Sequence, residues 1–245
     1  MGLEPAKWSN WSETCPTSCP IVQLSIKAPF HANNWKSTTY SFLSVYKRLF
    51  QNRSAKFGQK WITMTLLVPA KSTYHLYNQG NNKRIIFNDS LDYMHFLWLY
   101  RRYLQEHCDL MAWCLMPNHY HMMLMLKPSG EELIKIGPVV LTRFANGVRL
   151  MQSKYSRYFN DKYCQSGSVF RQRAKCKCCD DLQGDYRLTL FNYIHYNPVE
   201  SGLTERMSDW SFSSFTDYYH KRGGTLINKE LTAYYLGIEL DNSYF

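Results

Sequence analysis

The sequence predicts an α+β protein, built from short strands and amphipathic helices around a core. Strand-length runs rich in aromatic, β-branched and sulfur-containing residues end at Pro, Gly or Asn, whereas other segments repeat apolar residues every three or four positions. The chain has 245 residues, 45% of them hydrophobic, so it can bury a sizeable core. No apolar run approaches the roughly 18 residues of a membrane span. The first residues lack the layout of a secretory signal, so we expect a cytoplasmic protein with no membrane partner.

The first elements are predicted as follows. Residues 1–60 show no clear periodicity and are expected to form an extension with one short helix around residues 40–50. Residues 61–68 and 73–78 are strand-like, and the second run is followed by the turn residues Gln-Gly-Asn-Asn. Asp89 or Ser90 is expected to cap a helix that runs to about residue 106.

A β-hairpin and two helices complete the prediction. Residues 110–116 and 119–126 are strand-like and are joined by a Pro-Asn turn. Residues 141–159 form the clearest helix, with an apolar stripe and basic residues beside it. A basic loop is expected over residues 167–179. The last helix should run from about residue 185 to Asn197, because Pro198 disfavours helix at the preceding residue.

The net charge of +10 is concentrated in two stretches of the chain. Residues 1–60 hold eight Lys and Arg against two Asp and Glu, residues 141–179 hold nine against one, and residues 180–245 hold five against ten. Such concentrations are typical of proteins that bind a polyanion, with nucleic acid first and an anionic membrane second. A solvated surface without a partner explains the charge about equally well, so charge alone leaves both open.

Eight cysteines raise the question of a disulfide framework or a zinc site. Without a signal peptide, disulfides are not expected. The cluster Cys176, Cys178 and Cys179 is too tightly spaced for three sulfurs to share one tetrahedral ion, and the pair Cys15 and Cys19 has no obvious second pair. We therefore expect reduced, incidental thiols.

The run MPNHYHMMLML at residues 116–126 carries the first chemical signal. On a strand, His119 and His121 point to one face together with Met123 and Met125, while the residues between them point to the other. Two imidazoles placed in this way can converge on one divalent ion. Most such pairs are ordinary strand histidines, so a site needs further ligands and a reactive group.

The run FNYIHYNPVESGL at residues 191–203 offers those groups. Tyr193 and Asn197 are four residues apart, so on a helix they lie on one face. An amide oxygen can help to bind a metal, and a phenol can attack a group that the metal polarises. The residues alone fit a buried aromatic helix, with Tyr193 in the core, at least as well.

These runs resemble signatures of the HUH single-tyrosine transposases, and in particular of REP-associated tyrosine transposases. Residues 116–126 resemble the family's MPNH-hydrophobic-HLLL motif, and residues 193–203 resemble its YI-x-x-NPV-x-x-G segment. Three further runs resemble its first strand and turn, its basic G-x-x-[FW]-Q-x-R element and its W-x-x-SS element: residues 74–80, 167–173 and 210–214. The resemblance covers residues 61–220, between a basic N-terminal extension at 1–60 and a C-terminal tail at 221–245.

The resemblance implies a fold and a reaction. The fold would be a ferredoxin-like antiparallel sheet with helices on one face. A divalent metal, Mg²⁺ or Mn²⁺, would be held by His119, His121 and Asn197. Tyr193 would attack a scissile phosphate in single-stranded DNA, giving a 5′-phosphotyrosine link and a free 3′-hydroxyl. Tyr196 is the nearest rival but should point away from Asn197.

The resemblance also implies hairpin DNA of the REP type as the partner, bound by a monomer or a homodimer. Tyr155, Tyr158 and Phe170 are available for base stacking in this interpretation. The DNA backbone would follow the basic residues of the helix and loop, namely Arg143, Arg149, Lys154, Arg157, Arg171, Arg173, Lys175 and Lys177. Two alternatives remain: a non-catalytic DNA-binding protein on the same fold, and a metal-dependent hydrolase that uses water as the nucleophile.

Overall fold

The computed structural model describes residues 70–180, 186–219 and 222–238. The predicted extension at residues 1–60, with its short helix, and the predicted strand at residues 61–68 lie outside the described residues. So do Cys15 and Cys19. In the described part of the chain, no helix is both long enough and apolar enough to cross a membrane.

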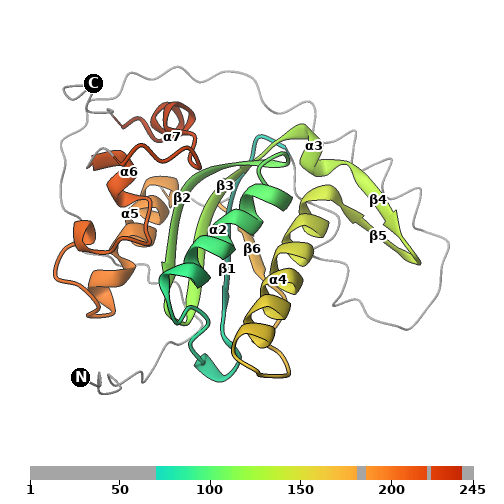
Figure 1. Cartoon of the computed structure of the whole chain (residues 1–245). Coiled ribbons are helices and arrows are strands. Elements are labelled where there is room, and N and C mark those ends of the chain that lie inside the picture. Colours follow the sequence, from blue (N-terminus) through green and yellow to red (C-terminus); the bar gives the residue numbers. More distant parts are fainter. Residues whose placement is uncertain (1–69, 181–185, 220–221, 239–245) are drawn as a thin grey trace, which may run out of the picture.

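The centre of the fold is a four-stranded antiparallel sheet in the order β2-β3-β1-β6 (Figure 1). Its strands are β1 (Thr73–Gln79), β2 (Cys108–Met116), β3 (His119–Leu126) and β6 (Lys175–Cys178). Helix α2 (Ser90–Tyr103) connects β1 to β2, and α4 (Arg143–Lys162) lies between β3 and β6 along the chain. This order is the split βαβ arrangement of ferredoxin-like folds, so the predicted fold class is confirmed.

Helices α2 and α4 cover one face of the sheet, as predicted. The alternation of β3 sends Tyr120, Met122 and Leu124 to this face, where they are buried with apolar side chains of both helices. Four residues of the stripe predicted for α4 lie in this core, Phe144, Val148, Met151 and Tyr155, and Phe159 joins them. Most of the core aromatic residues lie on this face.

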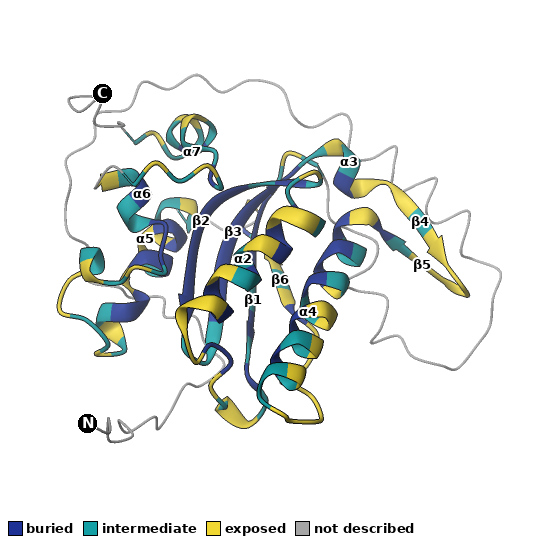
Figure 2. Cartoon of the chain, viewed as in Figure 1, coloured by how far each residue is buried: buried dark blue, intermediate teal, exposed yellow. Residues whose placement is uncertain are grey.

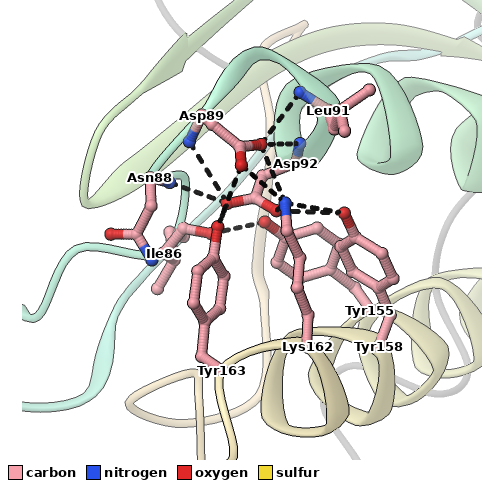
Figure 3. A network of polar contacts seen from close by, with 9 residues as sticks. All are labelled: Ile86, Asn88, Asp89, Leu91, Asp92, Tyr155, Tyr158, Lys162 and Tyr163. Carbon is pink, nitrogen blue, oxygen red and sulfur yellow. Dashed lines mark hydrogen bonds and ion pairs between the residues drawn. The ribbon is translucent and has the colours of Figure 1, made fainter.

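A polar cluster joins the start of α2 to the end of α4 (Figure 3). Asp89 caps α2 by accepting from the backbone N–H groups of Leu91 and Asp92. The fully buried Asp92 carboxylate accepts from Lys162 at 2.8 Å, and from Tyr158 at 3.1 Å and Tyr163 at 2.8 Å. Burial acts to raise the pKa of Asp92, but these donors lower it, so the carboxylate stays charged.

Helix α5 (Tyr186–Glu200) packs against the other face of the sheet, over β2 and β3. Its apolar residues Leu190, Phe191 and Ile194 meet small and sulfur-containing side chains of the strands, namely Met111, Ala112, Cys114, Met116, Met123 and Met125. A bulge in β2 places both Met111 and Ala112 on this face. Helices α6 (Phe215–Tyr219) and α7 (Lys229–Leu236) lie on the same side of the molecule (Figure 1).

The remaining elements are short. They are two 3-10 turns, η1 (Asn81–Lys83) and η2 (Met207–Asp209), the helix α3 (Pro128–Glu131), and a hairpin of β4 (Leu133–Ile136) and β5 (Val139–Thr142). The hairpin projects from the body and is mostly exposed (Figure 2). The described part of the predicted C-terminal tail packs on β2, where Asn228 N–H donates to the Leu110 carbonyl at 2.9 Å.

Two predictions of local structure were wrong. The predicted basic loop contains the edge strand β6, because Cys176 and Cys178 pack on the core while Lys175 and Lys177 alternate with them. Helix α5 continues past Asn197 to Glu200 with Pro198 inside it. Proline removes one backbone donor there, and the turn still closes through Ser201 N–H, which donates to the Asn197 carbonyl at 3.0 Å.

Candidate functional site

The face of the sheet beneath α5 carries the two histidines of the hairpin. His119 begins β3 opposite Gln79 of β1, and His121 pairs with Tyr77. Their rings are 5.1 Å apart between centroids, on the same face as Met123 and Met125. The prediction that these four side chains share one face is therefore confirmed.

Helix α5 brings Tyr193 and Asn197 to the histidines. The Tyr193 ring lies edge-on to His121, with 5.4 Å between centroids, and is partly exposed. Asn197 is buried. Its side-chain amide N–H donates to the backbone carbonyl of Tyr193 at 2.8 Å, which is possible because the two residues are four apart on a helix. The rival Tyr196 is 38% exposed. The four residues singled out from two distant motifs thus meet at one place.

The structure adds a third histidine to this site. His75 of β1 is buried, and its Nε2 lies 2.8 Å from Nδ1 of His121. His119 has a neighbour of its own, because its Nδ1 lies 2.6 Å from Oδ1 of Asn118. His75 was not among the site residues predicted from the sequence. It alternates with Leu76 on a predicted strand, but only the β1–β3 register reveals that it lies next to His121.

Burial keeps the three imidazoles neutral. It lowers the pKa of His119 to about 4, against an opposing contribution from the Asn197 side chain. It lowers the pKa of His75 to about 3, with Lys177 adding to the shift. It also lowers the pKa of His121 well below its ordinary value, and His75 and His119 lower it further. Neutral imidazoles at pH 7 can present a lone pair to a metal ion.

The donor set fits a divalent metal in one specific respect. Asn197 Oδ1 is buried, yet within the described residues it makes no hydrogen bond of normal geometry. The Asn197 side chain also interacts with His119, so the amide and the imidazole lie close together, and a cation bound between them would satisfy this oxygen. Among the described residues, no group of three or more His, Cys, Asp or Glu side chains is arranged to hold a metal.

A polar contact between His195 and Ser214 joins α5 to the sheet. The buried His195 Nε2 lies 2.7 Å from Ser214 Oγ, which also accepts from the backbone N–H of Trp113 at 2.9 Å. Ser214 belongs to the Trp-Ser-Phe-Ser-Ser run noted in the sequence. Burial lowers the pKa of His195 to about 3. Through Ser214, this contact links α5 to Trp113 of β2.

The predicted DNA-binding residues divide between the two faces. Lys175 and Lys177 lie on the histidine face, where Lys175 Nζ is 5.8 Å from the Tyr77 ring. Arg171 and Arg173 are exposed on the loop before β6, and Arg171 N–H donates to the Gln79 carbonyl beside His119. The four basic residues of α4 are on the helix that covers the opposite face, namely Arg143, Arg149, Lys154 and Arg157. A role for them in DNA binding stays a prediction, away from the histidines.

The predicted stacking residues of the α4 face were misassigned. Tyr155 and Phe170 are buried in the core, and Tyr158 belongs to the cluster around Asp92. Tyr155 is inside because the apolar stripe of the amphipathic helix α4 faces the core, and Phe170, from the segment between α4 and β6, packs in the same core. The described cysteines are free thiols, and burial raises the pKa of Cys176 and Cys179 to about 12.

Comparison with known proteins gives a sequence match. Over 110 residues, 44% of this chain, the sequence is 30% identical to a Haemophilus influenzae protein named REP-associated tyrosine transposase. The resemblance seen in the motifs is thereby confirmed. The match spans 58% of that relative's length. No family model matches the chain.

Two solved structures are similar at a lower level. One is a REP-associated tyrosine transposase bound to a REP hairpin, with 18% identity, a TM-score of 0.47, and coverage of 71% of this chain and 89% of that one. The other is described as a transposase from Deinococcus radiodurans, with 16% identity, a TM-score of 0.33, and coverage of 57% and 95%.

Proposed function

We propose that this protein is a metal-dependent transposase that nicks and rejoins single-stranded DNA through Tyr193. The observation that carries the proposal is the convergence of four side chains from two elements: His119 and His121 of β3, and Tyr193 and Asn197 of α5. A partly exposed phenol next to two neutral imidazoles and a buried amide oxygen suits phosphoryl transfer better than acid–base chemistry.

His119, His121 and Asn197 would hold the metal, Mg²⁺ or Mn²⁺. Each histidine has its Nδ1 close to a neighbour, His119 to Asn118 and His121 to His75. Donation from Nδ1 in both rings leaves the lone pair on Nε2, which is the arrangement that orients imidazole ligands in metal sites. The bound ion would polarise the scissile phosphate and stabilise the charge that develops on it.

The chain's own nucleophile is the Tyr193 oxygen. This oxygen attacks the scissile phosphorus, the bond from phosphorus to the 3′ oxygen breaks, and that oxygen takes up a proton while the phenol loses one. The products are a 5′-phosphotyrosine and a free 3′-hydroxyl. In the reverse step, a 3′-hydroxyl attacks the phosphotyrosine and restores the phenol. Because one ester replaces another, strand joining needs no external energy source.

A DNA hairpin of the REP type is the proposed substrate. The Haemophilus influenzae relative is named a REP-associated tyrosine transposase, and the motifs of this chain resemble those of the same group. In this chain, the exposed lysines of β6 and the arginines of the preceding loop would neutralise phosphates of the strand that enters the site.

The test is covalent capture. The full chain is incubated with hairpin DNA that carries single-stranded flanks, in Mg²⁺ or Mn²⁺, and is analysed on a denaturing gel. We expect a protein–DNA adduct that is abolished by a chelator and by Tyr193→Phe, and retained by the matched control Tyr196→Phe. Cleavage without an adduct would indicate the water-dependent hydrolase. Binding without cleavage under all conditions would indicate the non-catalytic protein.

A further inference from the structure

A row of side chains crosses the sheet on the histidine face. The strand registers pair Cys114 of β2 with His121 of β3, His121 with Tyr77 of β1, and Tyr77 with Lys175 of β6. The Tyr77 ring stacks on His75, with 4.5 Å between the ring centroids, and its centroid is 5.8 Å from that of His121. Lys175 Nζ lies 5.8 Å from the centre of the Tyr77 ring. The side chains along this row therefore change from buried thiol to imidazole to phenol to exposed cation.

The two ends of this row differ in exposure. Helix α5 packs over β2 and β3, so Cys114 is fully buried and His121 nearly so. Tyr77 is half-buried, and Lys175 is exposed. Lys177, which follows on β6, is also exposed, and its Nζ lies 5.1 Å from the Tyr186 ring. Aromatic faces and cations thus extend from the candidate metal site to the β6 edge of the sheet.

A half-exposed aromatic ring next to an exposed ammonium group is suited to a nucleotide. One face of the Tyr77 ring is covered by His75, so a base would stack on the other face, and the cation would bind the adjoining phosphate. This combination is typical of surfaces that bind single-stranded nucleic acid without reading its sequence. The Tyr77 ring is close to His121, so a base stacked on it would belong to a nucleotide near the scissile phosphate.

We infer that Tyr77 and Lys175 form a binding subsite for a nucleotide that flanks the cleavage point, with the base stacked on Tyr77 and a phosphate on Lys175. The inference rests on the proposed function, because it supplies the path by which a DNA strand reaches Tyr193. It also assigns base stacking to the histidine face instead of to the buried rings of α4.

The test uses 2-aminopurine, a fluorescent base whose emission falls when it stacks. It is placed at successive positions in the single-stranded flank of a DNA hairpin, and binding is measured in the full chain with Tyr193→Phe, so that no cleavage occurs. We expect quenching at one or two adjacent positions. Tyr77→Leu should remove the quenching and weaken binding about tenfold. Tyr77→Trp should keep both the quenching and the affinity of the parent. Tyr234→Leu, which changes the 83% exposed tyrosine of α7, is the matched control.

The contribution of Lys175 is measured separately from the salt dependence of binding. Lys175→Gln should make the slope of log affinity against log salt shallower by about 0.7, the value for one phosphate of a single strand. Lys135→Gln, an exposed lysine on the β4 hairpin, should leave the slope unchanged. Circular dichroism of each variant shows whether it folds, and Tyr77→Trp tests the subsite if Tyr77→Leu does not fold.

Several outcomes would overturn the inference. They are unchanged quenching in Tyr77→Leu, equal loss of binding in Tyr77→Leu and Tyr77→Trp, or a Lys175→Gln slope equal to that of the parent. The proposed function is tested apart from this, because its test is whether a chain altered only at Tyr193 loses an adduct that the parent chain forms. An adduct that needs Tyr193 but is indifferent to Tyr77 would leave the function in place and remove the subsite.

Discussion

The two faces of the sheet carry different kinds of core. The face under α2 and α4 is filled with large aromatic side chains, and its buried charge, Asp92, is paired with Lys162 and two tyrosines (Figure 3). The face under α5 is filled with methionine, cysteine and alanine, with three neutral histidines beside them. On that face the buried Asn197 Oδ1 lacks a normal hydrogen bond to any described residue. The first face is built for stability, and the second keeps groups available for chemistry.

The largest expected difference between the faces concerns catalysis. His119→Gln should reduce adduct formation by at least about 100-fold, because it removes a proposed metal ligand, whereas the free energy of unfolding should change by less than about 1 kcal/mol. His95 of α2, which stacks on Tyr158 on the other face, provides the matched control. Adduct rates and urea denaturation of both variants measure the two effects. Equal rates in His119→Gln and His95→Gln would remove the distinction between the faces.

The next largest effect concerns stability on the α2–α4 face. Asp92→Asn should lower the free energy of unfolding by about 3 kcal/mol, because Lys162 would lose its buried partner. Asp89→Asn should cost much less, since Asp89 is exposed and asparagine also caps helices well. Urea denaturation measures both. Adduct formation well below the melting temperature should be unchanged in both variants, and a specific loss of activity in Asp92→Asn would contradict this division.

A smaller effect is expected where α5 joins the sheet. Ser214→Ala should cost about 1–3 kcal/mol, because it leaves buried His195 and the Trp113 N–H without their partner. Ser208→Ala removes a partly exposed hydroxyl that donates to the neighbouring Asp209, and should cost less than about 0.5 kcal/mol. Thermal or urea unfolding gives both values. An equal cost at the two serines would mean that the His195–Ser214 contact does not hold α5 in place.

A further effect is a dependence of stability on pH. Burial lowers the pKa of His195 to about 3 in the folded chain, whereas the unfolded chain has the ordinary value of about 6.5. Below about pH 6.5 the unfolded state therefore binds the extra proton, and stability falls by up to about 1.4 kcal/mol per pH unit for each such histidine until the pH nears the folded value. Urea denaturation at pH 7.5 and pH 5 should show a smaller loss for His195→Gln than for the parent. An equal loss of stability in His195→Gln and in the parent would contradict this prediction.

Local patterns were sufficient to predict much of the fold and which of the four central side chains share a face. Alternation placed His119 and His121 on one face, and the spacing of four placed Tyr193 next to Asn197. Both are properties of a single strand or helix. The resemblance to a known family then indicated that the two pairs meet.

The remaining features depend on contacts between distant segments. His75 and Tyr77 join the site only through the register of β1 with β3, and β6 looks like a loop because Lys alternates with Cys at the edge of the sheet. Tyr155 was misassigned although it lies on the apolar stripe of α4, and Phe170 was misassigned because it lies in the segment after that helix, where no periodicity indicates its burial. Such choices are decided by tertiary packing.

The central claim is that the chemistry belongs to the α5 face, with Tyr193 as the nucleophile. Its most direct test is mass spectrometry of the covalent adduct after digestion with trypsin and nuclease. Trypsin cuts after Arg187 and Arg206, and the peptide between them contains two tyrosines, Tyr193 and Tyr196. Fragmentation should place the nucleotide on Tyr193. A nucleotide on Tyr196, or on any other peptide, would contradict the claim.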